Sequence, residues 1–233
     1  PNLLFESGHP LSTLDPVIQS ILRNRGIESV QDCNSDLSFL YPFESLKDID
    51  KACALLIVAY SNQEKILIVG DFDADGATST AVAIRGLRAL GFEHLNYLVP
   101  DRFKFGYGLS PALVELASEQ APDLIITVDN GISSVDGVTR AKELGIKVLV
   151  TDHHLPGDKV PDADAILNPN QKGCPFPSKN LAGVGVMFYL LIALRAKFRN
   201  EGIFENKQEP NLAILLDLVA LGTVADLVPL DVN

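Results

Sequence analysis

Acidic residues in this sequence gather directly after a short apolar run. The densest group is the run GDFDADG, in which Asp71, Asp73 and Asp75 follow the apolar residues 66–69. Three carboxylates spaced two residues apart repel one another strongly, so a fold that keeps them together is expected to hold a cation there. An EF-hand loop is excluded, because its twelfth position would be Val82, where a bidentate glutamate is required, and because a strand is expected before the run.

Three further segments offer carboxylate or imidazole groups at comparable places. They are the run TVDNG around Asp129, the run VTDHH that ends in His153 and His154, and the run GTVAD that ends in Asp226. Oxygen and imidazole ligands suit Mn²⁺, Mg²⁺ or a similar divalent ion. The four segments together predict a metal-dependent phosphoesterase site, with Asp129 placed to bridge two ions.

Each segment taken alone has a structural interpretation. A D-N-G run is an ordinary turn, two adjacent histidines can be solvated loop residues, and Asp226 can cap a helix. A capping role could also explain one of the three early aspartates, but not all three. The prediction of a metal site therefore rests on the combination.

Two other runs are candidates for contacting a substrate. The run RFKFGYG contains Arg102 and Lys104, which could hold phosphate oxygens, and Tyr107, which could stack on a base. A surface loop with one packed aromatic is an equally good interpretation. Gly183 and Gly185 begin an expected helix and could present N–H groups to a phosphate, although helix packing is the favoured role for them.

Alternating strands and helices must position these residues. Short β-branched runs predict strands, and the patterns between them predict helices. The strands are expected at 66–70, 95–99, 124–128, 146–151 and 164–167, and the helices at 76–90, 110–120, 133–144, 182–199 and 210–221. This repetition favours an α/β fold with a mostly parallel sheet flanked by helices. Ligands of such sheets collect at the carboxyl ends of the strands, where Asp71, Asp129 and the D-H-H triplet fall.

The first part of the chain follows a different pattern. Asp15 and Pro16 form a helix start, and residues 47–60 carry a second apolar helical pattern. We therefore expect an N-terminal helical and irregular covering segment at residues 1–60 and a catalytic domain at residues 61–233.

Composition limits the classes of protein that remain. The chain has 233 residues, 47% of them hydrophobic, and a net charge of −11. The acidic balance argues against a surface that simply coats DNA, although two divalent ions would reduce the net charge to −7. The cysteines at 33, 53 and 174 are odd in number and widely spaced, which favours a reducing cytoplasmic environment over a disulfide framework. No apolar run is long enough to span a membrane, and a start without methionine suggests a piece of a longer protein.

The motif runs together resemble the DHH phosphoesterase superfamily and, more narrowly, the RecJ family of single-strand-specific DNA exonucleases. The matching runs are GDFDADG (70–76), RFKFGYGLSP (102–111), TVDNGIS (127–133), VTDHHLPG (150–157), LNPN (167–170), FPSKNLAGVGV (176–186) and LGTVADLVPL (221–230). The resemblance implies two Mn²⁺ or Mg²⁺ ions and removal of nucleotides from the 5′ end of single-stranded DNA, in DNA repair and recombination.

The resemblance also implies particular residues and partners. The implied metal ligands are Asp73, Asp75, Asp129, His153, His154 and Asp226, and the implied catalytic residues are Asp71, Asp129 and His154. The partners would be single-stranded DNA, downstream DHHA1 and OB-fold domains of the same protein, and, as a candidate, a single-strand-binding protein. The alternatives are a DHH phosphoesterase for short oligonucleotides or cyclic dinucleotides, and a degenerate module that binds a partner. A pyrophosphatase is disfavoured, because Val69 and Gly70 stand near the place where those enzymes carry a histidine.

Overall fold

The structure, a computed structural model, describes residues 11, 14–24, 27, 37–231 and 233. The chain divides into two compact units, which are Pro1–Tyr41 with Leu230–Asn233 and the larger Pro42–Pro229. The described part of the first unit contains the helix α1 (Pro16–Asn24), which begins where the carboxylate of Asp15 accepts a hydrogen bond from the Val17 N–H at 2.8 Å. All residues of the expected metal site belong to the second unit.

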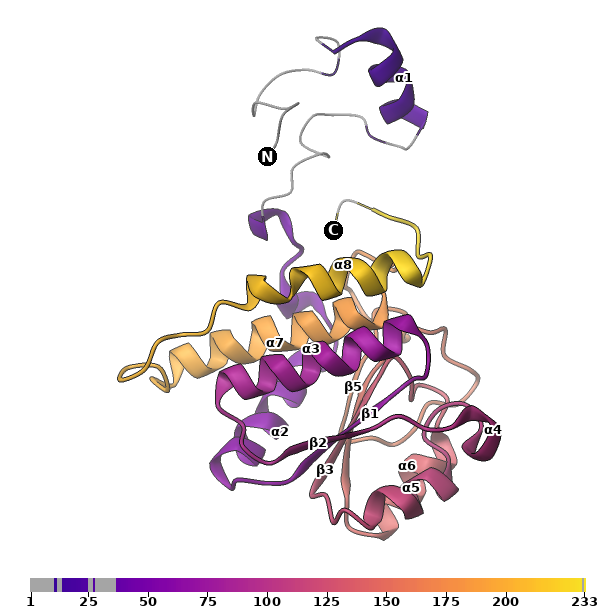
Figure 1. Ribbon diagram of the computed structural model, residues 1–233, viewed down its shortest axis with the longest axis vertical. Coiled ribbons are helices and arrows are strands. Elements are labelled where there is room, and N and C mark those ends of the chain that lie inside the picture. The colour runs from indigo at the N-terminus through magenta and orange to yellow at the C-terminus, as the bar shows by residue number, and fades with distance from the viewer. Residues whose placement is uncertain (1–10, 12–13, 25–26, 28–36, 232) are drawn as a thin grey trace. The chain divides into compact units, whose positions relative to one another are not determined.

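Five parallel strands form the sheet of the second unit (Figure 1). They lie side by side in the order β2-β1-β3-β4-β5, with the bounds β1 (Ile66–Gly70), β2 (Leu95–Leu98), β3 (Leu124–Val128), β4 (Lys147–Thr151) and β5 (Ala165–Leu167). The register pairs Gly70 with Val128 and Val128 with Thr151. The predicted parallel α/β fold is therefore confirmed. The residues after these three strand ends leave the sheet together, at an edge that we call the carboxyl edge.

Helices cover both faces of the sheet (Figure 1). One group consists of α2 (Ile49–Ser61), α3 (Ala74–Leu90), α7 (Gly183–Asn200) and α8 (Leu216–Ala225), and the other of α5 (Pro111–Ser118) and α6 (Val135–Glu143). Alternate strand residues such as Leu67 and Val69 join an apolar cluster with Leu113 of α5 and Val138 of α6. Burial on both faces explains why the strands read as nearly continuous apolar runs.

The boundary between the units differs from the expected domain boundary. The units divide after Tyr41, whereas the sequence placed a boundary near residue 60. The helix α2 accounts for the difference, because it packs against α7 and β5 within the second unit. Of the cysteines, Cys53 and Cys174 are free thiols, and Cys33 lies outside the described residues.

Two local elements differ from the elements expected from the sequence. The segment that begins at Arg102 forms a one-turn helix, α4 (Arg102–Phe105), whose first N–H groups are capped by Asp101. The last helix, expected at 210–221, begins as a 3₁₀ turn (Leu212–Leu215) and continues as α8 to Ala225, so Gly222 lies inside the helix. A side chain at Gly222 would overlap Thr78 and approach Val184, so the glycine lets α8 lie close to α3 and α7.

The remaining short elements are the 3₁₀ turns Leu37–Phe39 and Phe43–Ser45. The segment 168–179 has no helix or strand. Among the described residues, no helix combines the length and apolar character needed to cross a membrane.

Candidate metal centre

The first acidic run links β1 to α3. The Oδ1 atom of Asp73 accepts a hydrogen bond from the Gly76 N–H at 2.9 Å and so caps α3. Asp75 lies in the first turn of that helix and is almost fully buried. Its two oxygens accept hydrogen bonds from the N–H groups of Gly183, at 2.6 Å, and Val184, at 2.9 Å. The first turns of two helices thus meet at one carboxylate, which both helix dipoles favour.

Gly183 lets α7 approach the sheet closely. A Cβ atom there would lie 2.6 Å from the Cβ atom of Asp129 and 2.7 Å from its Oδ1 atom. The N–H of Gly183 donates to Asp75, and the N–H of Gly185 donates to the carbonyl of Ala182. Both N–H groups therefore have partners within the protein. A contact of these two glycines with a substrate phosphate stays a prediction.

Asp129 follows β3 in a tightly held turn. Its φ angle is 60°, in the left-handed region, and the next residues complete the reversal. The side-chain amide of Asn130 donates to the carbonyls of Val69 and Val128, at 3.1 and 2.9 Å, and so joins the ends of β1 and β3. The Thr127 hydroxyl donates to the carbonyl of Asn130 at 2.7 Å. These bonds fix the buried carboxylate of Asp129 at the centre of the carboxyl edge.

Asp152 organises the histidine pair. Its Oδ1 atom accepts hydrogen bonds from the N–H groups of His153, at 2.7 Å, and His154, at 3.1 Å, and lies 2.7 Å from the His154 Nδ1 atom. Its Oδ2 atom accepts a hydrogen bond from the Ile132 N–H at 2.8 Å. Because Asp152 can only accept, the proton belongs on Nδ1 and the Nε2 lone pair of His154 is left for a cation. The sequence analysis named Asp152 only as part of the D-H-H triplet and did not predict that it orients the two histidines. Its position directly before them could have suggested this role.

Two pKa shifts result from this contact. Burial alone would raise the pKa of Asp152, but the hydrogen bond and charge of His154, with the surrounding N–H groups, lower it below its ordinary value. The same hydrogen bond raises the pKa of His154 against the opposing effect of burial.

Asp226 reaches the site from the end of α8. Its N–H donates to the Gly222 carbonyl at 2.9 Å, and Leu227, with a φ angle of 58°, turns the chain away after it. Because Gly222 brings α8 close to Asp75, the Asp226 Oδ2 atom lies 3.5 Å from the His153 Nε2 atom.

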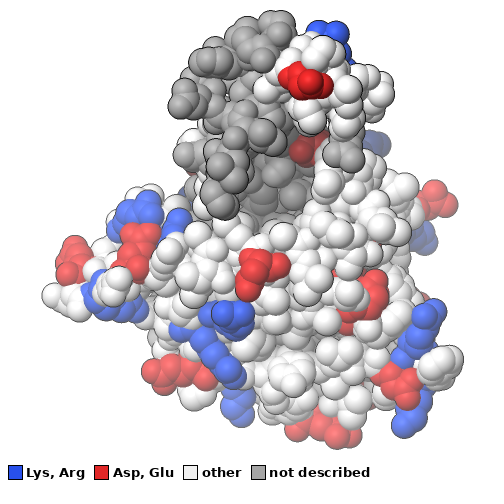
Figure 2. All heavy atoms as spheres, turned by 45° about the horizontal axis from the view of Figure 1, so that its top comes forward, with Lys and Arg blue, Asp and Glu red and all other residues white. Residues whose placement is uncertain are grey.

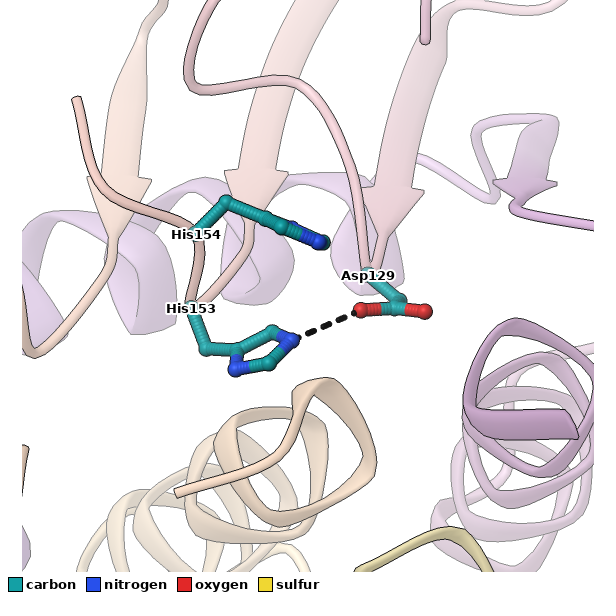
Figure 3. Close-up of side chains that lie close together, drawn as sticks. All are labelled: Asp129, His153 and His154. Atoms are coloured by element: carbon teal, nitrogen blue, oxygen red, sulfur yellow. Dashed lines mark ion pairs between the residues drawn. The ribbon is translucent and has the colours of Figure 1, made fainter. Parts of the chain in front are cut away.

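The expected ligands therefore converge on the carboxyl edge. Three overlapping groups each have ligand atoms within 4.8 Å of one another, and they are Asp129 with His153 and His154, Asp75 with His153 and Asp226, and Asp71 with Asp73 and Asp129. Figure 3 shows His153 and His154 on one loop, with the His153 ring directed at Asp129. The His153 Nε2 atom lies 3.2 Å from the Asp129 Oδ1 atom and 3.8 Å from the Asp75 Oδ2 atom.

These donors fit divalent cations. The Asp129 Oδ1 and His153 Nε2 atoms face each other, are buried, and have no hydrogen-bond partner of suitable geometry among the described residues. A carboxylate oxygen facing an imidazole lone pair is repulsive unless a proton or a cation lies between them. Burial, together with the charges of Asp75 and Asp73, raises the pKa of Asp129 to about 10. A cation would reverse this cost by stabilising the ionised carboxylate.

Two of the three aspartates in the run GDFDADG are affected by burial in the same way as Asp129. Burial also raises the pKa of Asp75 and of Asp71, against the hydrogen bonds that each accepts from main-chain N–H groups. Oxygen and imidazole ligands in this proportion suit Mn²⁺ or Mg²⁺.

The expected substrate residues flank the cluster. The Arg102 guanidinium carbon lies 4.3 Å from the centroid of the Phe72 ring, and its charge lowers the pKa of Asp71, a contribution smaller than that of burial. The Tyr107 hydroxyl lies 3.2 and 3.3 Å from the two ring nitrogens of His154. Lys104 is exposed on α4. The space-filling view of one face shows positive and negative side chains interspersed, without a continuous basic stripe (Figure 2).

Comparison with known families identifies the class of this fold and site. Residues 65–223 match the family described as "DHH family, N-terminal domain". The chain belongs to the DHH family.

Two curated relatives narrow the similarity. The chain is 54% identical over 222 residues to the single-stranded-DNA-specific exonuclease RecJ of Salmonella typhimurium and 53% identical over 222 residues to the Escherichia coli protein of the same name. Each match covers 94% of this chain and 38% of the relative. The resemblance to RecJ proteins is confirmed, and the chain spans well under half the length of these relatives.

Solved structures give the same grouping. A structure of Thermus thermophilus RecJ in complex with Mn²⁺ matches with a TM-score of 0.74 and 32% identity, over 94% of this chain and 29% of that one. A structure of exonuclease RecJ bound to manganese matches with a TM-score of 0.69 and 36% identity, over 83% of this chain and 46% of that one.

Proposed function

We propose that this chain is the catalytic part of a metal-dependent phosphodiesterase that removes nucleotides from the 5′ end of single-stranded DNA. The observation that carries the proposal is the convergence of Asp129 and Asp226, from two separate segments, on the Nε2 atom of His153, at 3.2 and 3.5 Å. The polarity and the single-strand preference rest on the similarity to RecJ proteins.

The ligand set divides around Asp129. Asp73 with Asp129 offers oxygens on one side, and Asp75, His153 and Asp226 offer a second group of donors. His154, held by Asp152, completes the set. We propose that Asp129 is shared between two Mn²⁺ or Mg²⁺ ions, which, when bound, would acidify the attacking water and neutralise charge on the phosphoryl oxygens.

The surrounding residues have roles in binding and orientation. Asp71 accepts the Phe72 N–H at 2.8 Å and adds charge beside Asp73, so it supports the first group without a contact to the second. Arg102 and Lys104 would hold phosphate oxygens of the strand. Tyr107 would hold its hydroxyl against His154 and offer its ring to a base. We propose Asp71, Asp129 and His154 as the catalytic residues, Asp129 and His154 as ligands and Asp71 through its support of the first group.

The length of the chain bears on strand binding. The chain carries a net charge of −11, and the interspersed charges of Figure 2 do not form a phosphate-tracking stripe. We propose that most of the grip on a long strand belongs to regions that the RecJ relatives have beyond the matched part. The isolated chain is therefore expected to cleave long strands poorly.

The test is a side-by-side hydrolysis assay with Mn²⁺. The substrates are long single strands labelled at the 5′ or the 3′ end, a dinucleotide, a cyclic dinucleotide and pyrophosphate. We expect metal-dependent release of the 5′ label, slower than from a full-length RecJ relative. Turnover confined to dinucleotides would favour the short-substrate phosphoesterase, and release of the 3′ label first would contradict the polarity.

A further inference from the structure

The main chain of the histidine pair is held by side chains from both directions. His153 and His154 lie outside the strands and helices, so no ladder of main-chain bonds fixes them. Their N–H groups donate to Asp152. Their carbonyls accept hydrogen bonds from another segment, because Asn168 Nδ2 donates to the His154 carbonyl at 2.9 Å and Asn170 Nδ2 donates to the His153 carbonyl at 2.6 Å.

The two asparagines are themselves firmly held. Asn168 directly follows β5 and is fully buried, and its Oδ1 atom accepts the Asn170 N–H at 2.7 Å. The Asn170 amide also donates to the Lys179 carbonyl at 3.3 Å. The Lys179 ammonium in turn donates to the carbonyls of Pro169, at 2.6 Å, and Cys174, at 3.0 Å. Hydrogen bonds within the irregular segment 168–179 therefore fix the positions of both asparagine side chains.

We propose that Asn168 and Asn170 are positioning residues of the metal centre. By holding the carbonyls of His153 and His154, they fix the main chain from which both imidazoles extend toward Asp129. A rotation of either peptide group would swing a ring nitrogen away from the carboxylates, and partners of metal-binding histidines typically change metal affinity about 10- to 100-fold when removed. This inference rests on the proposed function, because it assumes that the cluster binds metal.

The next residue in the chain provides a matched control. Gln171 is also a buried amide in the same segment, and its Nε2 atom donates to the Ile166 carbonyl at 2.6 Å. It ties the segment to β5 without contacting either histidine. Removal of the Gln171 amide therefore weakens the segment without freeing a histidine, whereas removal of the Asn170 amide frees the His153 carbonyl as well as that of Lys179.

The experiment measures Mn²⁺ affinity of the whole chain, without any substrate. Free Mn²⁺ is followed by electron paramagnetic resonance for the wild type, Asn170→Ala and Gln171→Ala, and the melting temperature of each metal-free protein is recorded. We expect Asn170→Ala to weaken Mn²⁺ binding about 10-fold. Gln171→Ala should bind Mn²⁺ within about twofold of the wild type, even if its melting temperature is lower.

The possible outcomes separate the two proposals. Equal Mn²⁺ affinity in Asn170→Ala and the wild type, or equal weakening in Asn170→Ala and Gln171→Ala, overturns the positioning role and leaves the metal site standing. Failure of the wild type to bind Mn²⁺ overturns the proposed function and this inference with it. Asn170→Ser shortens the side chain by one atom and withdraws its donor from the His153 carbonyl, so the same criteria apply to it if the alanine variant fails to fold.

Discussion

The two edges of the same sheet treat their charged groups in opposite ways. At the amino edge, the Asp123 carboxylate accepts the Lys65 N–H at 2.8 Å, and the Lys147 ammonium contacts both oxygens of Glu64 at 2.8 and 3.0 Å. The Asp164 carboxylate accepts the Val148 N–H at 2.8 Å. Each of these three acids has a donor of its own, so their charges are compensated within the protein.

At the centre of the carboxyl edge, buried acceptor atoms lack donors of this kind among the residues that the structure describes. Asp129 and His153 present buried acceptor atoms to each other, and burial with neighbouring carboxylates raises the pKa of Asp129 to about 10. The strands are the same at both edges, so the difference lies in the segments that enter and leave them. This contrast between the two edges supports the proposal of a cation site at the carboxyl edge.

The largest effect is expected from Asp129→Asn. This change keeps the shape of the side chain but removes the charge shared by two groups of ligands, so Mn²⁺-dependent hydrolysis should fall at least about 1,000-fold. The metal-free protein should melt at the same temperature or higher, because the neutral amide does not need the proton that burial imposes on Asp129, whose pKa is raised to about 10. The Mn²⁺-dependent hydrolysis rate tests the loss of activity, and thermal melting of the metal-free protein tests the effect on stability.

Asp123→Asn is the control at the amino edge. Its amide oxygen can still accept the Lys65 N–H, so activity should stay within about twofold. If both variants lost activity equally, the contrast between the edges would be broken.

A smaller loss is expected from Asp152→Asn. The amide can still accept main-chain N–H groups, but it lowers the basicity of His154 and no longer selects its Nδ1 proton. The Mn²⁺ dissociation constant, measured by calorimetry, should rise about 10- to 100-fold. An unchanged constant would mean that His154 is not a ligand.

Glu64→Gln tests how much the ion pair at the amino edge contributes to the stability of the protein. Glu64 is largely buried and pairs with Lys147, so the free energy of unfolding should fall by about 1 kcal/mol. Urea denaturation measures the change, and Lys147→Met with the double variant isolates the pair. Mn²⁺ affinity should not change, and a parallel loss of affinity would show that the two edges are coupled.

The smallest effect is expected from Phe72→Leu. This change removes the ring beneath Arg102, and an exposed cation–π contact contributes about 0.5 kcal/mol. KM for a single strand should rise about twofold with kcat unchanged. A fall in kcat alone would place Arg102 in the chemical step instead of in binding.

Local pattern was sufficient to predict the edge but not its details. Apolar runs located the strands, and the parallel topology then required Asp71, Asp129 and Asp152 to emerge together. The partners of Asp75 could not be read from the sequence, because the N–H of Gly183 lies 108 residues away and meets it only through the packing of α7. The role of Gly222 could not be predicted for the same reason, since only the approach of α8 to Thr78 shows why this position has no side chain.

The most direct test is to locate Mn²⁺ at the two edges of the sheet. Anomalous X-ray diffraction at the manganese absorption edge does this, on crystals of this chain grown with millimolar Mn²⁺. We predict strong peaks among Asp75, Asp129, His153 and Asp226, and none beside Glu64, Asp123 or Asp164. Well-ordered crystals with no peak at the carboxyl edge would contradict the account.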